Sequence, residues 1–215
     1  MTLGIVDDHL LFRDLVRGIC REVAGIQVVF EAGNGIDAIG GILGQRPEML
    51  VLDIGLPDID GCEVLDRVHL EGAWPRVFVL SAFCSPFLVF RLGQVGIHAF
   101  LDKTTVTVAS LRSAFSEFTN HRQVFSPSFI GIQERRKKDP LSFDKLLTNQ
   151  QMRVLSLVAH NFNDQAIASH LKIGPRTVEN HRTEIMRKLG IHSRVDLMRF
   201  AADQGFSNGP APSHV

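Results

Sequence analysis

The chain has 215 residues, of which 45% are hydrophobic, and its 23 Lys and Arg residues balance 23 Asp and Glu residues. We expect one large or two modest domains of a soluble globular protein. The longest apolar region, residues 77–90, is too interrupted and too short to cross a bilayer, and the first residues enter a strand pattern directly rather than a signal peptide. A cytoplasmic location is therefore expected.

The zero net charge conceals an asymmetry between the two halves of the chain. Residues 1–120 carry 9 Lys and Arg against 15 Asp and Glu, whereas residues 121–215 carry 14 against 8. This split predicts two domains with different partners, the acidic one favouring cations and the basic one favouring polyanions. Charge alone does not identify the polyanion as nucleic acid.

Strand-like and helix-like segments alternate throughout the first 120 residues. The clearest helix is expected over residues 10–23, where Leu11, Leu15, Ile19 and Val23 recur every four positions. Five βα units of this kind predict a doubly wound, five-stranded parallel sheet of the α/β class. The expected strands are Leu3–Val6, Gln27–Phe30, Met49–Leu52, Val77–Leu80 and Ala99–Leu101.

Polar side chains follow four of these strands at their carboxyl ends. Asp7 and Asp8 follow the first strand and Asp53 follows the third, so three carboxylates are expected at the edge where open α/β sheets bind ligands. Their mutual repulsion favours a hard divalent cation with oxygen ligands. Ser81 and Lys103 follow the fourth and fifth strands. The edge is therefore suited to a phosphoryl group, with Asp53 as the nucleophile.

Residues 1 to about 120 resemble the receiver domain of bacterial response regulators, which has a flavodoxin-like fold. Four elements carry the resemblance: VDDH, the DxxxPxxDG that begins at Asp53, Ser81, and the FLDK that ends at Lys103. The resemblance implies that Asp53 is the phosphoacceptor. It also implies Mg²⁺ as cofactor, bound by Asp8, Asp53 and the carbonyl of Gly55, with Asp7 holding the ion through water.

The same resemblance implies a switch formed by Ser81 and Phe100, with Lys103 contacting the phosphate. A new phosphoryl oxygen would pull Ser81 inward and vacate space for the Phe100 ring. Phenylalanine lacks the tyrosine hydroxyl often found at this position, so this switch would rest on packing alone. Gly55 and Leu56 also depart from common choices and are expected to leave the path to Asp53 open.

Residues 121–144 are expected to form a linker, because the helix and strand patterns fade there. The basic run Arg135–Lys138 is typical of a solvated segment and is not assigned to a site. The last residues, 208–215, are expected to form a flexible tail. Cys20, Cys62 and Cys84 lack the CxxC spacing of a metal or redox motif, which indicates reduced and packed thiols.

Four helices are predicted in a second domain, residues 145–207. Thr148 is expected to cap the first, with Gln151 as the capping-box partner. A tight turn through Gly174 separates the second helix from a longer one that begins at Pro175, which is the layout of a helix-turn-helix. The predicted helices are Asn149–His160, Asp164–Leu171, Pro175–Leu189 and Arg194–Asp203.

The longer of these helices leaves a polar arc exposed once its apolar stripe is buried, and an α-helix fits the major groove of DNA. Glu179 would be repelled by phosphate, so we expect it to meet a base donor or to orient an arginine. Lys188 and Arg187 are expected to anchor the phosphate backbone. The predicted DNA-binding residues are Arg176, Thr177, Glu179, Asn180, Arg182, Thr183, Arg187 and Lys188.

This half resembles the LuxR-type helix-turn-helix through LT at 147–148, IASHL and RTVENHRTEIMRKLGIHSR. With the receiver-like half, the chain resembles a two-component response regulator of the NarL/FixJ type. The resemblance implies a sensor histidine kinase as phosphodonor, double-stranded DNA as partner and a homodimer when active. Gln150 and Gln151 stand where Arg and Glu are usual, and Asp164 and Ala166 stand where Asn and Glu are usual; the loss of the two Glu positions is expected to weaken the tethering between helices.

Three functions are compatible with this sequence. The first is a phosphorylation-controlled transcription factor, which acts on itself and is not an enzyme with turnover. The second is a pseudo-receiver, whose acidic site is vestigial and whose DNA binding is regulated by protein contacts. The third is a metal-dependent aspartyl-phosphate phosphohydrolase, although Gly55 stands where such enzymes usually place a proton-donating acid. For the second half, a protein-interaction bundle with solvated charges is the alternative to a DNA reader.

Overall fold

The computed structural model describes residues 1–23 and 25–209 and divides into two compact units. Unit 1 comprises Met1–Cys84 and Arg91–Gly131, and unit 2 comprises Ser85–Phe90 and the chain from Ile132 onward. Of the predicted tail, residues 210–215 lie outside the described residues. Within the described ranges, no helix combines the length and hydrophobicity needed to cross a bilayer.

Unit 1 is built on a parallel sheet in the strand order β2-β1-β3-β4-β5-β6. The predicted parallel α/β sheet is confirmed, with one strand more than the five that we expected. The additional strand is β6, which pairs its two residues with Ala99 and Phe100 of β5. The six strands are β1 (Thr2–Val6), β2 (Gln27–Ala32), β3 (Met49–Leu52), β4 (Arg76–Ser81), β5 (Ala99–Asp102) and β6 (Val124–Phe125).

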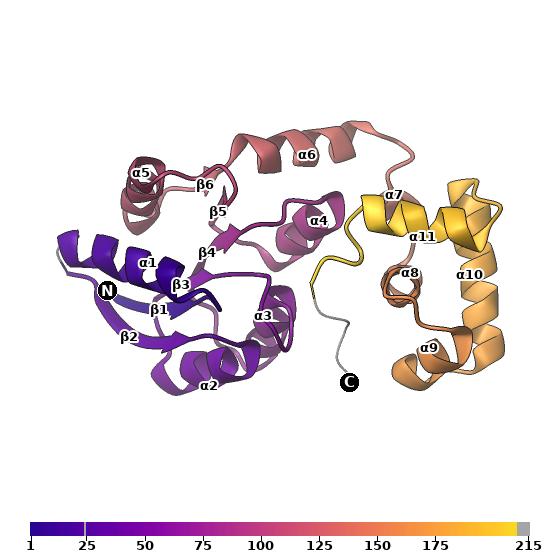
Figure 1. Ribbon diagram of the computed structural model, residues 1–215, viewed down its shortest axis with the longest axis horizontal. Helices are drawn as coiled ribbons and strands as arrows, with labels where there is room; N and C mark the ends of the chain where they lie inside the picture. The colour runs from indigo at the N-terminus through magenta and orange to yellow at the C-terminus, as the bar shows by residue number, and fades with distance from the viewer. Residues whose placement is uncertain (24, 210–215) are drawn as a thin grey trace. The chain divides into compact units, whose positions relative to one another are not determined.

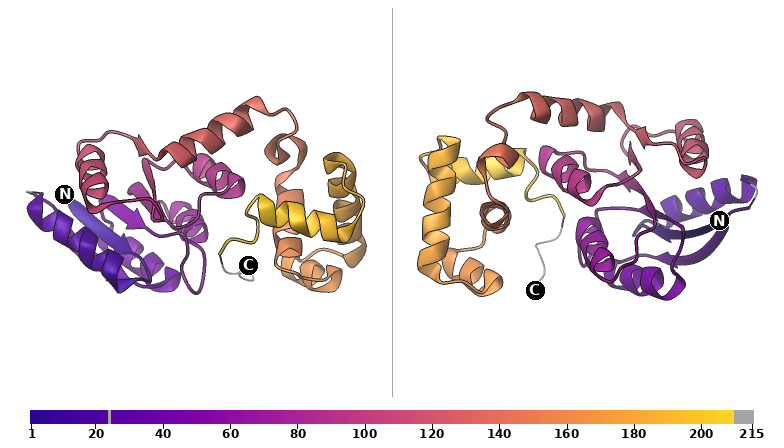
Figure 2. Two further views of the ribbon diagram at one scale, coloured as in Figure 1. Left: turned by 45° about the horizontal axis from the view of Figure 1, so that its top comes forward. Right: turned by 180° about the vertical axis from the view of Figure 1, so that it is seen from behind.

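Helices cover both faces of this sheet, with α1 and α5 on one face and α2 and α3 on the other (Figure 1 and Figure 2). Alternate residues of a strand point to opposite faces, so Met49 and Val51 of β3 belong to the core under α1 and α5. The helices are α1 (Leu10–Glu22), α2 (Gly35–Gln45), α3 (Gly61–Leu70), α4 (Pro86–Val95) and α5 (Val108–Thr119).

Helix α1 buries most of the stripe that we predicted, but not its first residue. Ile19 is buried with Val16 and Cys20, and Leu15 and Val23 pack against the same core, whereas Leu11 is 77% exposed. The sequence pattern alone does not say where along this helix the contact with the sheet begins.

Residues 121–144 contain regular structure although the sequence pattern fades there. Besides β6, the structure has helices α6 (Pro127–Lys138) and α7 (Phe143–Leu146) in or across this segment. The basic run is not uniformly solvated, because Arg136 lies 2.7 Å from the Asp144 carboxylate and its side chain is only 15% exposed. Burial by itself raises the pKa of Asp144, but the hydrogen bonds from Ser142 and Arg136, together with the Arg136 charge, leave this pKa lowered.

Unit 2 contains four helices that match the predicted ones within a residue at each end. Thr148 and Gln151 form the predicted capping box at the start of α8. Pro175 opens α10 in its first turn, and Gly190 ends that helix in the left-handed region at φ 65°. The helices are α8 (Asn149–Ala159), α9 (Asp164–Leu171), α10 (Pro175–Leu189) and α11 (Arg194–Asp203).

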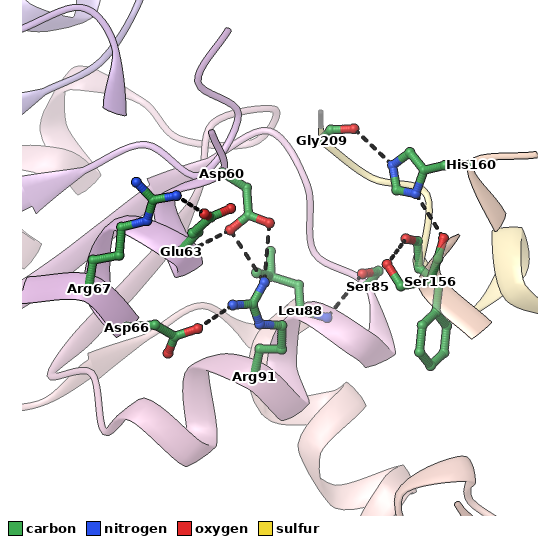
Figure 3. Close-up of polar contacts among 11 residues, drawn as sticks. Asp60, Glu63, Asp66, Arg67, Ser85, Leu88, Arg91, Ser156, His160 and Gly209 are labelled. Atoms are coloured by element: carbon green, nitrogen blue, oxygen red, sulfur yellow. Dashed lines mark hydrogen bonds and ion pairs between the residues drawn. The ribbon is translucent and has the colours of Figure 1, made fainter. Parts of the chain in front are cut away.

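The helices of unit 2 enclose one apolar core. Its fully buried members include Val154, Leu155, Ile167, Val178, Ile185, Leu197 and Ala201. The chain after α11 is tied to α8, since Ser156 Oγ donates to the Phe206 carbonyl at 3.3 Å and a ring nitrogen of His160 lies 3.4 Å from the Gly209 carbonyl (Figure 3). The core orients α10 so that its polar arc faces outward.

Thiol reactivity tests the packing of the three free cysteines. Burial raises the pKa of Cys62 to about 12 and that of Cys20 to about 11, whereas Cys84 is only half-buried. At pH 8 we expect a disulfide reagent such as DTNB to modify Cys84 in the native protein, and the other two thiols only after denaturation. Native Cys84→Ser protein should release almost no chromophore. Rapid modification of two or more thiols in the native wild type would contradict this packing.

Candidate functional site

The register of the central strands brings the predicted carboxylates together. Val6 of β1 pairs with Leu52 of β3, so Asp7 and Asp53 leave the sheet side by side. The amide of Asp53 donates to the Val6 carbonyl at 2.8 Å. Both aspartates are buried, at 3% and 4% exposure, which is unusual for carboxylates without a partner.

Lys103 supplies that partner to both carboxylates. Its Nζ lies 2.6 Å from Oδ2 of Asp7 and 2.7 Å from Oδ2 of Asp53, and its own side chain is only 6% exposed. The backbone amide of Lys103 donates to the Ser81 carbonyl at 2.9 Å, and Nζ lies 4.5 Å from the centroid of the Phe12 ring. One buried ammonium group therefore pairs with two buried carboxylates.

Asp8 and His9 complete the cluster at its exposed side. One potential ligand atom from each of Asp7, Asp8, His9 and Asp53 lies within 4.8 Å of all the others. We call the three carboxylates of Asp7, Asp8 and Asp53 the acidic pocket. One lysine cannot neutralise three carboxylates, so the pocket could hold a divalent cation, and its hard oxygen donors suit one.

The crowding in the acidic pocket is visible in Asp7. Burial is the largest influence on this carboxyl and raises its pKa, against the opposing effects of Lys103 and of the His9 amide, which donates to Oδ1 at 2.9 Å. The nearby charge of Asp53 raises the pKa further. The guanidinium of Arg13 donates to the Asp7 carbonyl at 2.6 Å and so fixes the backbone but not the carboxylate.

Ser81 and Phe83 border the pocket from the end of β4. Ser81 is fully buried and accepts a hydrogen bond from the Phe83 amide at 3.1 Å, so its hydroxyl can still donate. A Cβ built on Gly55 would lie 3.3 Å from the Phe83 ring and 4.0 Å from Oδ1 of Asp53. We expected Gly55 and Leu56 to leave the path to Asp53 open, but Leu56 is buried and the Phe83 ring lies beside Gly55.

Phe100 lies on β5 with its side chain fully buried. Its ring centroid is 5.0 Å from that of Phe129 on α6, and Phe129 in turn stacks on Phe125 of β6 at 4.9 Å. Any rotation of the Phe100 ring therefore has to be accommodated by the aromatic side chains of the last strand and of α6.

Backbone amides donate hydrogen bonds to the two other acids of the loop after Asp53, which are Asp58 and Asp60. Asp58 accepts from the amides of Gly35 and Ile36 at 2.7 and 2.9 Å, so it caps α2, and these hydrogen bonds lower its pKa against burial. Asp60 caps α3 by accepting from the Glu63 amide at 2.7 Å. Both acids are therefore structural, as their position beside Pro57 and Gly61 indicates.

Two further contacts restrict this loop. Arg91 of α4 lies 3.1 Å from the Asp60 carboxylate and 2.6 Å from that of Asp66 (Figure 3). It therefore links α4 to the N-cap residue of α3 and to a residue within that helix. A Cβ on Gly61 would lie 2.5 Å from the carbonyl oxygen of Asp53. Only glycine fits there without displacing the backbone of Asp53.

The predicted DNA-binding residues lie along α10, but the structure gives them different surroundings. Arg176, Thr177, Asn180, Thr183 and Arg187 are exposed. Two of the arginines pair along the helix surface, as Arg176 does with Glu179 at 2.6 Å and Arg187 with Glu184 at 2.8 Å. Glu179 thus orients an arginine, which is one of the two roles expected for it.

Two predicted DNA contacts also hold the helices together. Arg182 lies 2.6 Å from the Asp164 carboxylate of α9, and Lys188 donates to Gln151 Oε1 of α8 at 2.9 Å. Asp164 and Gln151 are two of the residues at which the sequence departs from the usual pattern. These two pairs therefore provide polar contacts between the helices at two positions where the sequence departs from the usual pattern.

Removal of one acid tests the crowding of the acidic pocket. A carboxyl whose pKa is raised by folding binds its proton more tightly in the folded protein than in the unfolded protein. The free energy of unfolding therefore falls as the pH rises from the pKa of the unfolded state, near 3.8, through the pKa of the folded state. We therefore expect Asp7→Asn to raise Tm by a few degrees at pH 7 without divalent ions, and to flatten the fall in Tm above pH 4. Thermal unfolding followed by circular dichroism measures both effects. A lower Tm for this variant would show that the ion pair with Lys103 outweighs the repulsion.

Two protein families match separate parts of the chain. The family described as "Response regulator receiver domain" matches residues 3–115, and that described as "Bacterial regulatory proteins, luxR family" matches residues 145–201. Response regulator protein VraR of Staphylococcus aureus is 27% identical over 203 residues, which cover 94% of this chain and 97% of VraR.

Solved structures of RcsB from Salmonella share the fold. RcsB bound to promoter rprA in the presence of the phosphomimetic BeF₃⁻ superposes with a TM-score of 0.67 at 20% identity, covering 94% of this chain and 98% of RcsB. A structure of two RcsB dimers bound to two parallel DNAs gives 0.62 at 19% identity with the same coverage. The chain therefore belongs to the response regulator receiver-domain family and combines its receiver with a LuxR-type helix-turn-helix, which places it among two-component transcriptional regulators rather than enzymes.

Proposed function

We propose that Asp53 accepts a phosphoryl group from a sensor histidine kinase and that phosphorylation changes dimerisation and DNA binding. The observation that carries this proposal is the buried arrangement in which Lys103 lies 2.6 and 2.7 Å from two acids of a three-carboxylate pocket. A structural ion pair needs one acid for one base, whereas phosphoryl transfer needs a nucleophilic carboxylate, a cation-binding set and a separate ammonium. The similarity to VraR and RcsB, which are response regulators, is consistent with this assignment.

Mg²⁺ fits the donor set of the acidic pocket. Its preferred ligands are a few carboxylate oxygens together with water, and Asp8 and Asp53 would supply the former. Asp7 would act through water, and the carbonyl of Gly55 would add a neutral oxygen. When bound, Mg²⁺ supplies positive charge to the phosphoryl oxygens as they approach the carboxylates.

The protein side chains then have separate tasks in the transfer. A carboxylate oxygen of Asp53 forms the new bond to phosphorus while the bond from phosphorus to the kinase imidazole breaks, and the imidazole nitrogen keeps the electron pair. Lys103 is held in place by Asp7 and can pair with a phosphoryl oxygen. Ser81 can donate its hydroxyl proton to another, because its oxygen already accepts from the Phe83 amide.

The signal would leave the pocket through Ser81 and Phe100. Movement of Ser81 toward the phosphoryl group frees space on β4, and the adjacent β5 carries Phe100 opposite Val79. The Phe100 ring packs on Phe129, so its rotation would change the packing of α6.

We propose residues 1–120 as the receiver domain, 121–144 as the connector and 145–207 as the DNA-binding domain of a cytoplasmic protein.

Double-stranded DNA is the partner proposed for α10. Exposed Arg176, Asn180, Thr183 and Arg187 would reach bases and phosphates, with Thr177 beside them at the start of the helix. Arg182 and Lys188 would serve mainly to position this helix, because both already contact α8 or α9. RcsB has been solved as dimers bound to DNA, and an active homodimer on paired half-sites is the corresponding proposal here.

Phosphorylation is tested by intact mass after incubation with Mg²⁺ and a small phosphodonor such as acetyl phosphate. We expect one acid-stable, base-labile phosphoryl group on the wild type and on Asp203→Asn, a matched change at an exposed aspartate in unit 2. Asp53→Asn should carry none, and Lys103→Met should be phosphorylated at least tenfold more slowly because it lacks the phosphate-pairing ammonium. Equal labelling of wild type and Asp53→Asn, or none in either, would favour the pseudo-receiver alternative.

DNA binding is tested with the full chain, with and without beryllofluoride, on DNA carrying half-sites about ten base pairs apart. Beryllofluoride should tighten binding in the wild type but not in Asp53→Asn. Affinity should fall steeply with salt, and Arg187→Ala should reduce the slope of log K against log salt by about one. Arg122→Ala, which removes an exposed arginine from unit 1, should leave the slope unchanged. Binding that is insensitive to salt would indicate a protein-interaction bundle instead.

A further inference from the structure

His9 is the member of the cluster to which neither the resemblance nor the proposed function assigns a role. It occupies the N-cap position of α1, where the side chain usually accepts a hydrogen bond from the first turn, but no such bond forms. Its ring turns instead toward the acidic pocket, with Nδ1 2.6 Å from Oδ1 of Asp8 and 3.5 Å from Oδ1 of Asp7. The histidine is therefore positioned by the pocket and not by the helix that it begins.

The His9 ring also contacts an aromatic side chain of α1. Phe12, one turn along α1, meets the His9 ring edge-on with centroids 6.3 Å apart. The His9 amide is bonded to Asp7, which fixes the backbone from which the ring projects. These contacts reduce the conformational entropy that the side chain would lose on binding an ion.

The distances suit coordination of a single ion after small shifts. Oxygen and nitrogen ligands lie about 2.0–2.2 Å from a first-row transition metal, so two ligands on one ion are separated by about 3 Å when adjacent and about 4.2 Å when opposite. The corresponding atoms of His9 and of the acidic pocket all lie within 4.8 Å of one another. His9 is 64% exposed at the side chain, which leaves it free to move the remaining few tenths of an ångström.

We propose that Nδ1 of His9 is a ligand to a first-row transition-metal ion in the acidic pocket, where it adds a nitrogen donor to the carboxylate oxygens. The inference rests on the proposed function, since it concerns the ion that assists Asp53. Imidazole binds such ions increasingly well from Mn²⁺ to Ni²⁺, whereas Mg²⁺ takes oxygen ligands. The receiver thus has one more donor for a transition-metal ion than for Mg²⁺, and the identity of the ion in the pocket depends on His9.

Metal affinity in the full chain tests this inference. Chelator-treated wild type, His9→Ala and His192→Ala are titrated calorimetrically with Mg²⁺ and with Ni²⁺. His192 is an exposed histidine of unit 2 and serves as the matched control. We expect His9→Ala to weaken Ni²⁺ binding at least tenfold while changing Mg²⁺ binding less than twofold, and His192→Ala to change neither.

A spectroscopic readout on the wild type removes any dependence on the variant's folding. Pulsed EPR of bound Mn²⁺ in protein labelled with ¹⁵N-histidine should show a directly coordinated imidazole nitrogen, and the coupling should vanish in His9→Ala. One outcome would overturn the inference and leave the proposed function intact. In that outcome Asp8→Asn weakens the binding of Mg²⁺ and Ni²⁺, but the EPR spectrum shows no nitrogen coupling and His9→Ala binds Ni²⁺ as tightly as the wild type. If no divalent ion binds the pocket of the wild type, the inference and the cation-assisted phosphorylation both fail.

Discussion

One buried ammonium group, that of Lys103, makes the acidic edge of the receiver possible. Without it, Asp7 and Asp53 would be two buried acids with no cationic partner, and leaving a buried charge uncompensated in this way typically costs roughly 3–5 kcal/mol. With it, the pocket still carries more negative than positive charge. That remaining negative charge means that the pocket could hold a cation, which would offset the repulsion among its carboxylates.

The position of this lysine is a property of the sheet and not of any local motif. Asp7, Asp53, Ser81 and Lys103 are far apart along the chain, yet each lies at the carboxyl end of a strand of the same parallel sheet. Parallel strands present their carboxyl ends at one edge, so the order β1-β3-β4-β5 places the four side chains on neighbouring strands. The chemistry therefore follows from topology, and the helices on both faces serve to keep those strands in register.

The features of the fold that appear as local patterns in the sequence could be predicted from it. Apolar runs before Asp7 and Asp53 indicated the strands, and the Thr148 and Gln151 pair indicated the start of α8, because each pattern is local and reflects one physical cause. The features that depend on tertiary contacts could not be predicted. The buried stripe of α1 excludes Leu11, and β6 is too short to leave an apolar run. The ion pairs of Arg91 with Asp60 and of Arg182 with Asp164 gave no sequence signal, since the partners are 31 and 18 residues apart.

The glycine that opens α3 sets a limit of another kind on this receiver. A methyl group at position 61 would overlap the carbonyl oxygen of Asp53, so the backbone there has no tolerance for a larger neighbour. The start of α3 is thus in direct contact with the backbone of Asp53, and a purely steric change at position 61 can displace this aspartate while every charged atom stays intact. The proposed phosphorylation of Asp53 would therefore be sensitive to a steric change as well as to an electrostatic one, and the two would be distinguished by whether added cation restores the geometry.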